Sequence, residues 1–369
     1  MRGSVCGLLP AEDIQALVDA LRARGHAVIA PVVDGGVLAL AEVANADAIA
    51  AGWTAEQTPG RYRLTRRADS LRFATGPTAL PWKRFLHPPE TLLFRARRDG
   101  DDFAVTETPP APRPQALLGL LPCDLAAVAR LDEAMAGDAL YQARRQATLL
   151  VAVTCAEAAA TCFCTSLGTG PAVAGPCDLA LSELPGRGLL VEARSAAGEA
   201  IAAALPLTAA EDRDFADRDA IAARTAAAQT RRLPADVAGV LRRAVEHPRW
   251  QAVADRCLTC GNCTSQCPTC FCSTVEDATS LDGATAERRR VWDGCFSLDF
   301  SYVVGGPVRQ SAAARYRHWI THKLSTWHDQ FGTSGCVGCG RCIAWCPVGI
   351  DITEEAAILA AAEEREAAP

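Results

Sequence analysis

The sequence contains no apolar run long enough to cross a membrane. Its longest apolar stretch, Leu149–Ala160, already includes Glu157, whereas a membrane helix needs about 20 consecutive apolar residues. Glu12 and Asp13 also leave too short a segment before them for an apolar export signal. We therefore expect no membrane association and a cytoplasmic location.

Positive charge is also scarce. The formal net charge is -6 at pH 7, and Lys83 and Lys323 are the only lysines. A nucleic-acid-binding protein needs a basic face, so nucleic acid is not an expected partner. Because arginine and alanine are abundant, we interpret the lack of lysine as codon bias of a GC-rich genome, without functional meaning.

Motifs for nucleotide binding and hydrolysis are missing too. The sequence has no G-x-G-x-x-G after a strand and no G-x4-G-K-[ST], which mark dinucleotide and triphosphate sites. No Ser/His/Asp or Cys/His set of a hydrolase stands out either. We expect a protein without catalytic residues or a substrate site of its own.

Cysteine, in contrast, is abundant, with 17 residues in a chain of 369. A disulfide-rich secreted scaffold would be much shorter and would carry an export signal. We therefore expect free thiols in a reducing compartment, where they are available to bind metal.

Eight cysteines form two runs with one spacing, C-x2-C-x2-C-x3-C-P, which is typical of a pair of [4Fe-4S] clusters. In such a module the first three thiolates of each run bind one cluster, and the fourth binds the other. The predicted ligands of the first cluster are Cys257, Cys260, Cys263 and Cys346. Those of the second are Cys336, Cys339, Cys342 and Cys267.

Structural zinc is the alternative interpretation, because C-x2-C pairs also bind that ion. Zinc would use two such pairs and leave four thiols over, whereas two cubanes use all eight. The repeated run therefore favours iron–sulfur clusters.

A strand, a helix and a second strand are expected in the N-terminal part. An apolar strand at Gln115–Leu121 precedes a helix that continues through Met135, and Thr148–Val153 is another apolar strand. Asp124 is expected to cap the helix. This order is typical of parallel strands, whose ligands gather at the carboxyl ends.

Four further cysteines follow these two strands. Cys123 and Cys155 come directly after them, and Cys162 and Cys164 lie in a T-C-F-C sequence of the second loop. Four thiols in two adjacent loops could hold a third cluster, but buried cysteines also pack as small apolar residues. The residues alone leave both interpretations open.

The composition changes beyond the sheet. Ser195–His247 is alanine-rich, charged and without strand pattern, so helices that join two domains are expected there. We place the boundary before Pro234. The predicted fold class is α+β: residues 1–233 form an α/β domain with a largely parallel sheet, and residues 234–369 form a mostly helical, ferredoxin-like 4Fe-4S dicluster domain.

Three cysteines of the C-terminal part lie outside the two runs. Cys270 and Cys272 belong to a second T-C-F-C sequence, and Cys295 follows later. We favour packing against the neighbouring cluster over ligation for all three. Packing is also expected for His318 and His322, because no acidic base or third ligand accompanies them.

Five segments resemble one known family. These segments are Gly119–Asp124, Thr161–Pro171, Cys257–Asp277, Trp292–Phe296 and Thr333–Cys342. Together they resemble the beta subunit of cytoplasmic sulfhydrogenases, which are NAD(P)-linked [NiFe] hydrogenases. The related iron–sulfur A subunit of anaerobic sulfite reductase is similar.

The resemblance implies a non-catalytic electron-transfer subunit of a hetero-oligomer. Its clusters would pass electrons between a flavin subunit that binds NAD(P)H and the small subunit of a [NiFe] hydrogenase, whose large subunit holds the nickel. The resemblance also favours a third cluster on Cys123, Cys155, Cys162 and Cys164.

Two alternative functions stay open. One is an iron–sulfur relay subunit of an anaerobic sulfite or sulfur reductase, which differs from a hydrogenase relay only in its partners. The other is a cluster-bearing redox sensor or assembly factor. The acidic balance of the sequence and the lack of a recognition-helix motif argue against that sensor.

Overall fold

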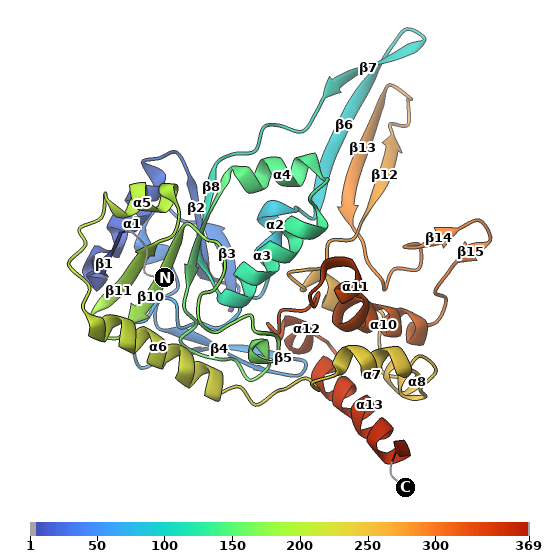
Figure 1. Ribbon diagram of the computed structural model, residues 1–369. Coiled ribbons are helices and arrows are strands. Elements are labelled where there is room, and N and C mark those ends of the chain that lie inside the picture. The colour runs from blue at the N-terminus through green and yellow to red at the C-terminus, as the bar shows by residue number, and fades with distance from the viewer. Residues whose placement is uncertain (1–4, 368–369) are drawn as a thin grey trace.

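A seven-stranded sheet forms the centre of the N-terminal part in the computed structural model, which describes residues 5–367 (Figure 1). Four consecutive strands of this sheet pair in parallel, and the other three pair with their neighbours in antiparallel fashion. Across the sheet the strands are β1 (Cys6–Leu9), β11 (Gly188–Ala193), β10 (Leu179–Leu184), β9 (Thr148–Val153), β8 (Gln115–Leu120), β2 (Ala27–Asp34) and β3 (Val37–Glu42). The first four residues of the N-terminal segment considered above lie outside the described residues.

Helices cover both faces of this sheet. Leu118 of β8 packs on one face with apolar residues of α1 and α5, whereas Leu117 packs on the other face with residues of α3. Because successive strand residues face opposite sides, a strand covered on both sides must be apolar throughout. The helices are α1 (Ile14–Arg22), α2 (Lys83–Leu86), α3 (Pro122–Ala134), α4 (Ala139–Gln146), α5 (Ala196–Ala202) and α6 (Asp212–Ala227).

The predicted strand, helix and strand are therefore confirmed as β8, α3 and β9. Since β8 and β9 pair in parallel, the residues that follow them lie at the same edge of the sheet. Cys123 and Cys155 are both at this edge.

The C-terminal part is mostly helical around the cysteine loops, as the sequence predicts. A separate apolar core that includes Trp250, Trp319, Ile343 and Leu359 joins its helices. These helices are α7 (Val237–Arg243), α8 (Arg249–Ala254), α9 (Asn262–Ser265), α10 (Ala312–Thr321), the π-helical turn η4 (His322–Thr326), α11 (Trp327–Phe331), α12 (Arg341–Ala344) and α13 (Ile352–Ala367). The fold is α+β.

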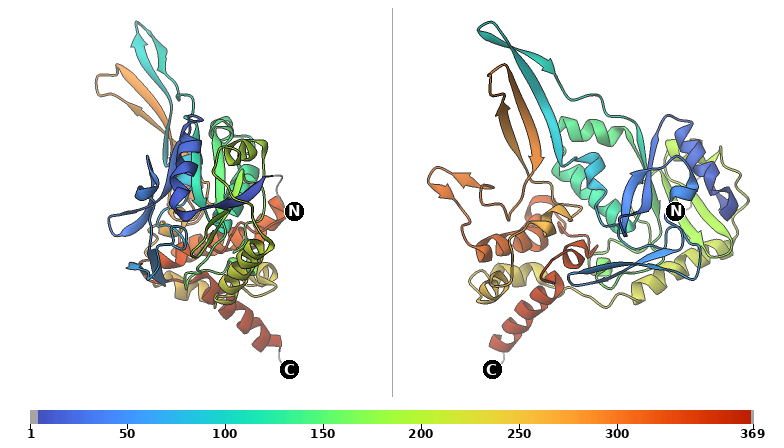
Figure 2. Two further views of the ribbon diagram at one scale, coloured as in Figure 1. Left: turned by 90° about the vertical axis from the view of Figure 1, so that its left-hand side faces the viewer. Right: turned by 180° about the vertical axis from the view of Figure 1, so that it is seen from behind.

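A four-stranded antiparallel sheet projects from the body of the molecule (Figures 1 and 2). In order its strands are β12 (Ser273–Thr279), β13 (Thr285–Trp292), β6 (Glu90–Asp99) and β7 (Asp102–Glu107). Two of these strands precede residue 233 in the chain and two follow it, so this sheet links the two predicted domains. The boundary itself stays a prediction.

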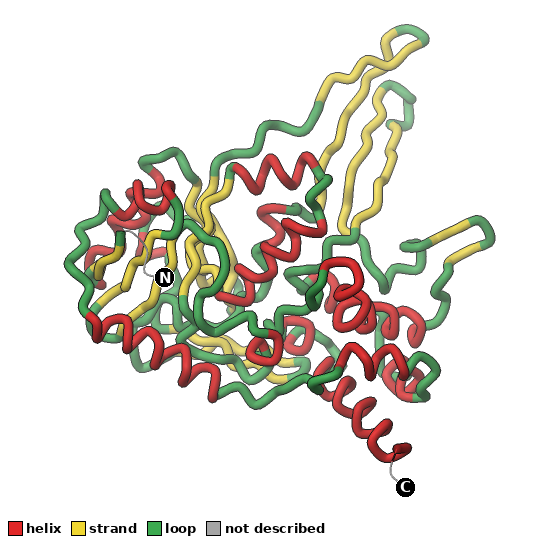
Figure 3. The backbone as a smooth tube through the Cα atoms, in the orientation of Figure 1, coloured by secondary structure: helices red, strands yellow, loops and turns green. Residues whose placement is uncertain are grey.

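The sequence analysis missed β12 and β13, which extend well beyond the helices in Figure 3. Their side chains are mostly polar, so no apolar alternation marks them. Cross-strand ion pairs stabilise their pairing instead; Arg288 Nε lies 2.7 Å from Asp277 Oδ1.

Two small hairpins complete the fold: β4 (Trp53–Thr58) with β5 (Arg61–Arg66), and β14 (Tyr302–Val303) with β15 (Gly306–Pro307). Within the described range, 5–367, no helix is both long and apolar enough to span a bilayer.

Candidate metal centres

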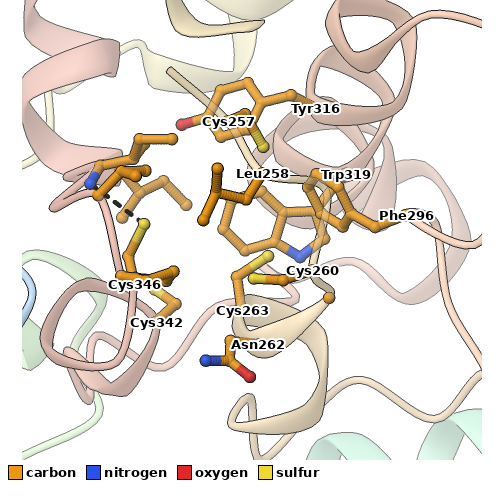
Figure 4. Close-up of a pocket in the computed structure, with 15 residues that line it drawn as sticks. Cys257, Leu258, Cys260, Asn262, Cys263, Phe296, Tyr316, Trp319, Cys342 and Cys346 are labelled. Carbon is orange, nitrogen blue, oxygen red and sulfur yellow. Dashed lines mark hydrogen bonds between the residues drawn. The ribbon is translucent and has the colours of Figure 1, made fainter.

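The first predicted ligand set lines one cavity. Cys257, Cys260 and Cys263 come from the chain around α9, and Cys346 follows α12. Figure 4 shows their sulfur atoms gathered around the same space. Cys342, predicted for the second set, also borders this cavity. The tertiary structure thus brings the first set together, although ligation itself stays a prediction.

The wall of this cavity is mainly apolar. Phe296 and Trp319 form part of it, and the backbone N–H of Ile350 donates a hydrogen bond to Cys346 Sγ at 3.3 Å. Exclusion of water and hydrogen bonds to sulfur both adjust the reduction potential of a bound cluster. The apolar wall and the Ile350 N–H would therefore influence the reduction potential of a cluster bound here.

The second predicted ligand set gathers beside the first. Burial raises the pKa of Cys336, Cys339 and Cys342, and the charge of the nearby Cys267 raises the pKa of each further. In addition, the ammonium of Lys323, on η4, donates a hydrogen bond to Cys267 Sγ at 3.2 Å. A buried cation beside this group of thiols compensates the negative charge that thiolate ligands would bring.

The spacing of the thiols fits a multi-iron cluster better than a single ion. Among residues 5–367, no three His, Cys, Asp or Glu side chains converge closely enough to hold one metal ion. Tetrahedral zinc would need sulfur atoms about 3.8 Å apart, from a Zn–S bond of about 2.3 Å. A cubane has four irons between its thiolates and needs a wider set. The four thiols of the first set, which line one cavity, are the ligand type that such a cluster takes.

The third predicted set lies at the edge of the seven-stranded sheet. Cys123 lies in the first turn of α3, Cys155 follows β9, and Cys164 packs in the same apolar core as Cys123. A Cβ atom added to Gly170 would lie 3.2 Å from Cys164 Sγ and 3.2 Å from Pro122 Cβ. The loop of Gly170 therefore holds these two segments close together.

Burial is the largest influence on the thiols of this set. It raises the pKa of Cys155 to about 12 and the pKa of Cys123 and Cys162 well above the usual value. Such thiols keep their protons at neutral pH in the metal-free protein. Metal binding would displace these protons, because only the thiolate is a ligand.

The loops of the second and third sets are in direct contact. The backbone N–H of Phe163 donates to the carbonyl oxygen of Gly338 at 2.9 Å, and Thr169 Oγ1 donates to that of Val337 at 2.8 Å. A Cβ atom added to Gly338 would lie 2.5 Å from Cys164 Cα. Only glycine permits this approach, which places Cys164 beside the loop between Cys336 and Cys339.

The prediction that Asp124 caps α3 is wrong. Asp124 lies in the first turn of α3, and the helix has no side-chain cap. Its carboxylate instead forms a buried ion pair with Arg341, between Cys339 and Cys342. A bidentate arginine outcompetes a backbone N–H for the same carboxylate because the interaction is charged at both ends.

Sequence reasoning missed two polar side chains that contact cysteine sulfur. Lys323 bonds to Cys267, as described above, and Gln229 Nε2 donates to Cys164 Sγ at 3.1 Å. The rarity of lysine was a signal for the first, which we had interpreted as codon bias. The sequence contains no signal for Gln229, which lies far from the cysteine motifs.

Comparison with known proteins gives two matches. The model of a 4Fe-4S dicluster domain matches residues 256–350. Sulfhydrogenase 2 subunit beta of Pyrococcus furiosus is 31% identical in an alignment over 307 residues that covers 79% of this chain and 86% of that protein.

Proposed function

Because this chain belongs to the family of sulfhydrogenase beta subunits, we propose that it relays electrons between a flavin subunit that binds NAD(P)H and a [NiFe] hydrogenase. The family is one of iron–sulfur electron-transfer subunits, so the chain works in a hetero-oligomer. The small subunit of the hydrogenase is the proposed partner on one side, and the flavin subunit on the other.

We further propose the two reciprocal ligand sets as those of the dicluster domain. When bound, the two clusters supply one-electron carriers whose potentials depend on hydrogen bonds to sulfur, net charge and exposure to water. The chain contributes eight thiols, a mainly apolar wall at the first set and the Lys323 ammonium at the second.

A third cluster on Cys123, Cys155, Cys162 and Cys164 is also part of the proposal. The observation that carries it is the contact between Gly338 and Cys164, because carriers exchange electrons only if they lie close together.

One end of the relay lies at the protein surface. Cys260 is exposed, and the neighbouring Leu258 is 62% exposed. Cys123, Cys162 and Cys164, in contrast, are buried. We infer that a partner subunit contacts the face around Leu258 and exchanges electrons there.

Iron and acid-labile sulfide in anaerobically purified protein test the third cluster. Replacing Cys162→Ala should remove about four irons per chain. The matched control is Cys6→Ala, because Cys6 lies on β1, in a core that contains none of the predicted ligands. An equal iron content in both variants would show that the chain holds only the two clusters of the dicluster domain.

Copurification tests the partners. Affinity capture of this chain from its own host should bring down a flavoprotein and a nickel-containing subunit in fixed ratio. A sirohaem protein in their place would assign the chain to a sulfite reductase. Capture without any flavoprotein would contradict the relay.

A further inference from the structure

The base of the β12–β13 hairpin brings the three remaining cysteines together. The register of this hairpin pairs Ser273 with Trp292, and the Asp293 N–H donates to the Cys272 carbonyl oxygen at 3.1 Å. Cys272 therefore lies beside the segment that leads to Cys295, and Cys270 is two residues away in the chain. Sequence separation had hidden this convergence.

The three thiols line one cavity, which Phe271, Trp319 and Trp327 also border. The side chains of Cys272 and His318 both lie beside that of Cys295. His318 belongs to α10. Three thiols and, beside Cys295, one imidazole thus lie around the hairpin base. We call this group the hairpin-base site: Cys270, Cys272, Cys295 and His318.

The only two lysines of the chain flank this site, and each is 3% exposed. Lys83 Nζ donates to the Cys270 carbonyl oxygen at 2.8 Å and lies 4.0 Å from the ring centre of Trp292. The hydrogen bonds of both ammonium groups within residues 5–367 go to carbonyl oxygens, a hydroxyl and a sulfur. None of these acceptors is a carboxylate. Buried cations need compensating negative charge.

An unused hydrogen-bond donor also borders the cavity. Trp327 is 2% exposed, and its indole N–H is buried without an acceptor among the described residues. Buried donors are almost always paired, so an acceptor is expected next to this ring. A sulfide of a bound cluster would be such an acceptor.

We propose that Cys270, Cys272, Cys295 and His318 hold a further iron–sulfur cluster. A single metal ion does not fit, because no three of these side chains converge around one point. A thiolate-ligated cluster is anionic, so it would compensate Lys83, which donates to carbonyl oxygens only, and would accept from the indole N–H. This ligand set has three cysteines and one histidine, which distinguishes it from the other three predicted sets.

The position of the site suggests its role, which rests on the proposed relay function. Thr269 Oγ1 donates to the Gly335 carbonyl oxygen at 2.6 Å, and Phe163 contacts Gly338 on the same loop. The two T-C-F-C sequences thus both touch the loop of the second set. A cluster at the hairpin-base site would exchange single electrons with that second cluster and would form a branch of the relay.

Iron, sulfide and paramagnetic resonance of the anaerobic full-length protein test the inference. Cys295→Ser should remove about four irons per chain, and the double variant with Cys162→Ala should lose about eight. Cys6→Ser is the control and should keep them all. His318→Ala should also lose iron, whereas His318→Cys should keep it and change the resonance signal of one cluster.

Several results would overturn the inference. One is an iron content in Cys295→Ser equal to that of the wild type. Another is one zinc per chain that is lost in this variant, and a third is a Cys272–Cys295 disulfide in the purified protein. If Cys295→Ser does not fold, the iron content of the wild-type protein decides. About twelve irons per chain, of which Cys162→Ala removes about four, would leave no iron for the hairpin-base site. Failure to copurify with a flavoprotein would contradict the relay, and with it the proposed role of this site, but it would leave the iron count of the site unchanged.

Discussion

Arg341 and Asp124 form a two-pronged ion pair inside the protein, with Nη1–Oδ1 at 2.7 Å and Nη2–Oδ2 at 3.1 Å. Each side chain is 1% exposed. Asp124 directly follows Cys123, and Arg341 directly precedes Cys342. The pair therefore joins the sheet edge that carries the third set to the loop that carries the second.

Arg341→Met should destabilise the protein strongly. It leaves the Asp124 carboxylate buried without a partner, and loss of one member of a buried pair costs about 3–5 kcal/mol. The measurement is anaerobic urea unfolding followed by far-UV circular dichroism. The double variant with Asp124→Leu should recover most of the loss, since no unpaired charge remains.

A surface pair provides the control for this prediction. Arg113 and Glu42 also form a two-pronged pair, but their side chains are 68% and 50% exposed. Arg113→Met should change the free energy of unfolding by less than about 1 kcal/mol. A similar loss in Arg113→Met and Arg341→Met would contradict the importance we give to burial.

Gly338→Ala should separate the second and third ligand sets. The new methyl group would collide with the backbone of Cys164, and Gly338 has a φ of +63° that disfavours any side chain. We expect slower electron exchange between the two clusters and lower stability. Freeze-quench paramagnetic resonance during reduction measures the exchange.

Gly332→Ala is the matched control, because Gly332 has a φ of +68° but no atom within 4 Å of an added Cβ. It should show only the left-handed backbone penalty, about 1–2 kcal/mol. If Gly338→Ala were equally mild and electron exchange were unchanged, the contact would have no role in the relay.

Lys323→Met should make the second cluster harder to reduce. The ammonium donates to Cys267 Sγ and favours the more negative, reduced state. A hydrogen bond to a charged group is worth about 1.5–3 kcal/mol, or about 60–130 mV for one electron. A redox titration should therefore show a more negative midpoint. Lys83→Met should shift this midpoint less, because Lys83 donates to carbonyl oxygens only.

Stability should fall when the pH decreases from 7 to 5, partly because of His87. Burial lowers the pKa of His87 to about 4, whereas the unfolded chain has a pKa of about 6.5. Between these values the unfolded state binds more protons, so acid favours unfolding. The contribution is about 2 kcal/mol from pH 7 to pH 5.

The comparison of two variants isolates this effect. His87→Phe should flatten the dependence of the unfolding free energy on pH, whereas the same change at His328, which is exposed, should leave it as in the wild type. An unchanged slope in His87→Phe would show that His87 has the same pKa in the folded and unfolded chain.

Much of the N-terminal fold could be predicted from local pattern. β8 and β9 are apolar throughout because both faces of the sheet are covered, and such runs can be recognised in a sequence. Placing Cys123 and Cys155 at one edge then required only that the two strands be parallel. The charged strands β12 and β13 have no such pattern. They form because β13 pairs with β6, and β6 lies too far away in the chain for a local pattern to reveal the pairing.

The sequence by itself determined the chemistry of this protein: the spacing of two cysteine runs defines which thiols can meet in one turn, and this holds whatever surrounds them. Only the tertiary structure decided which distant groups join them. Asp124 binds Arg341, Lys323 binds Cys267, and Cys295 meets Cys272. Long-range partners of this kind depend on how sheets and helices pack, and packing leaves no periodic trace in the sequence.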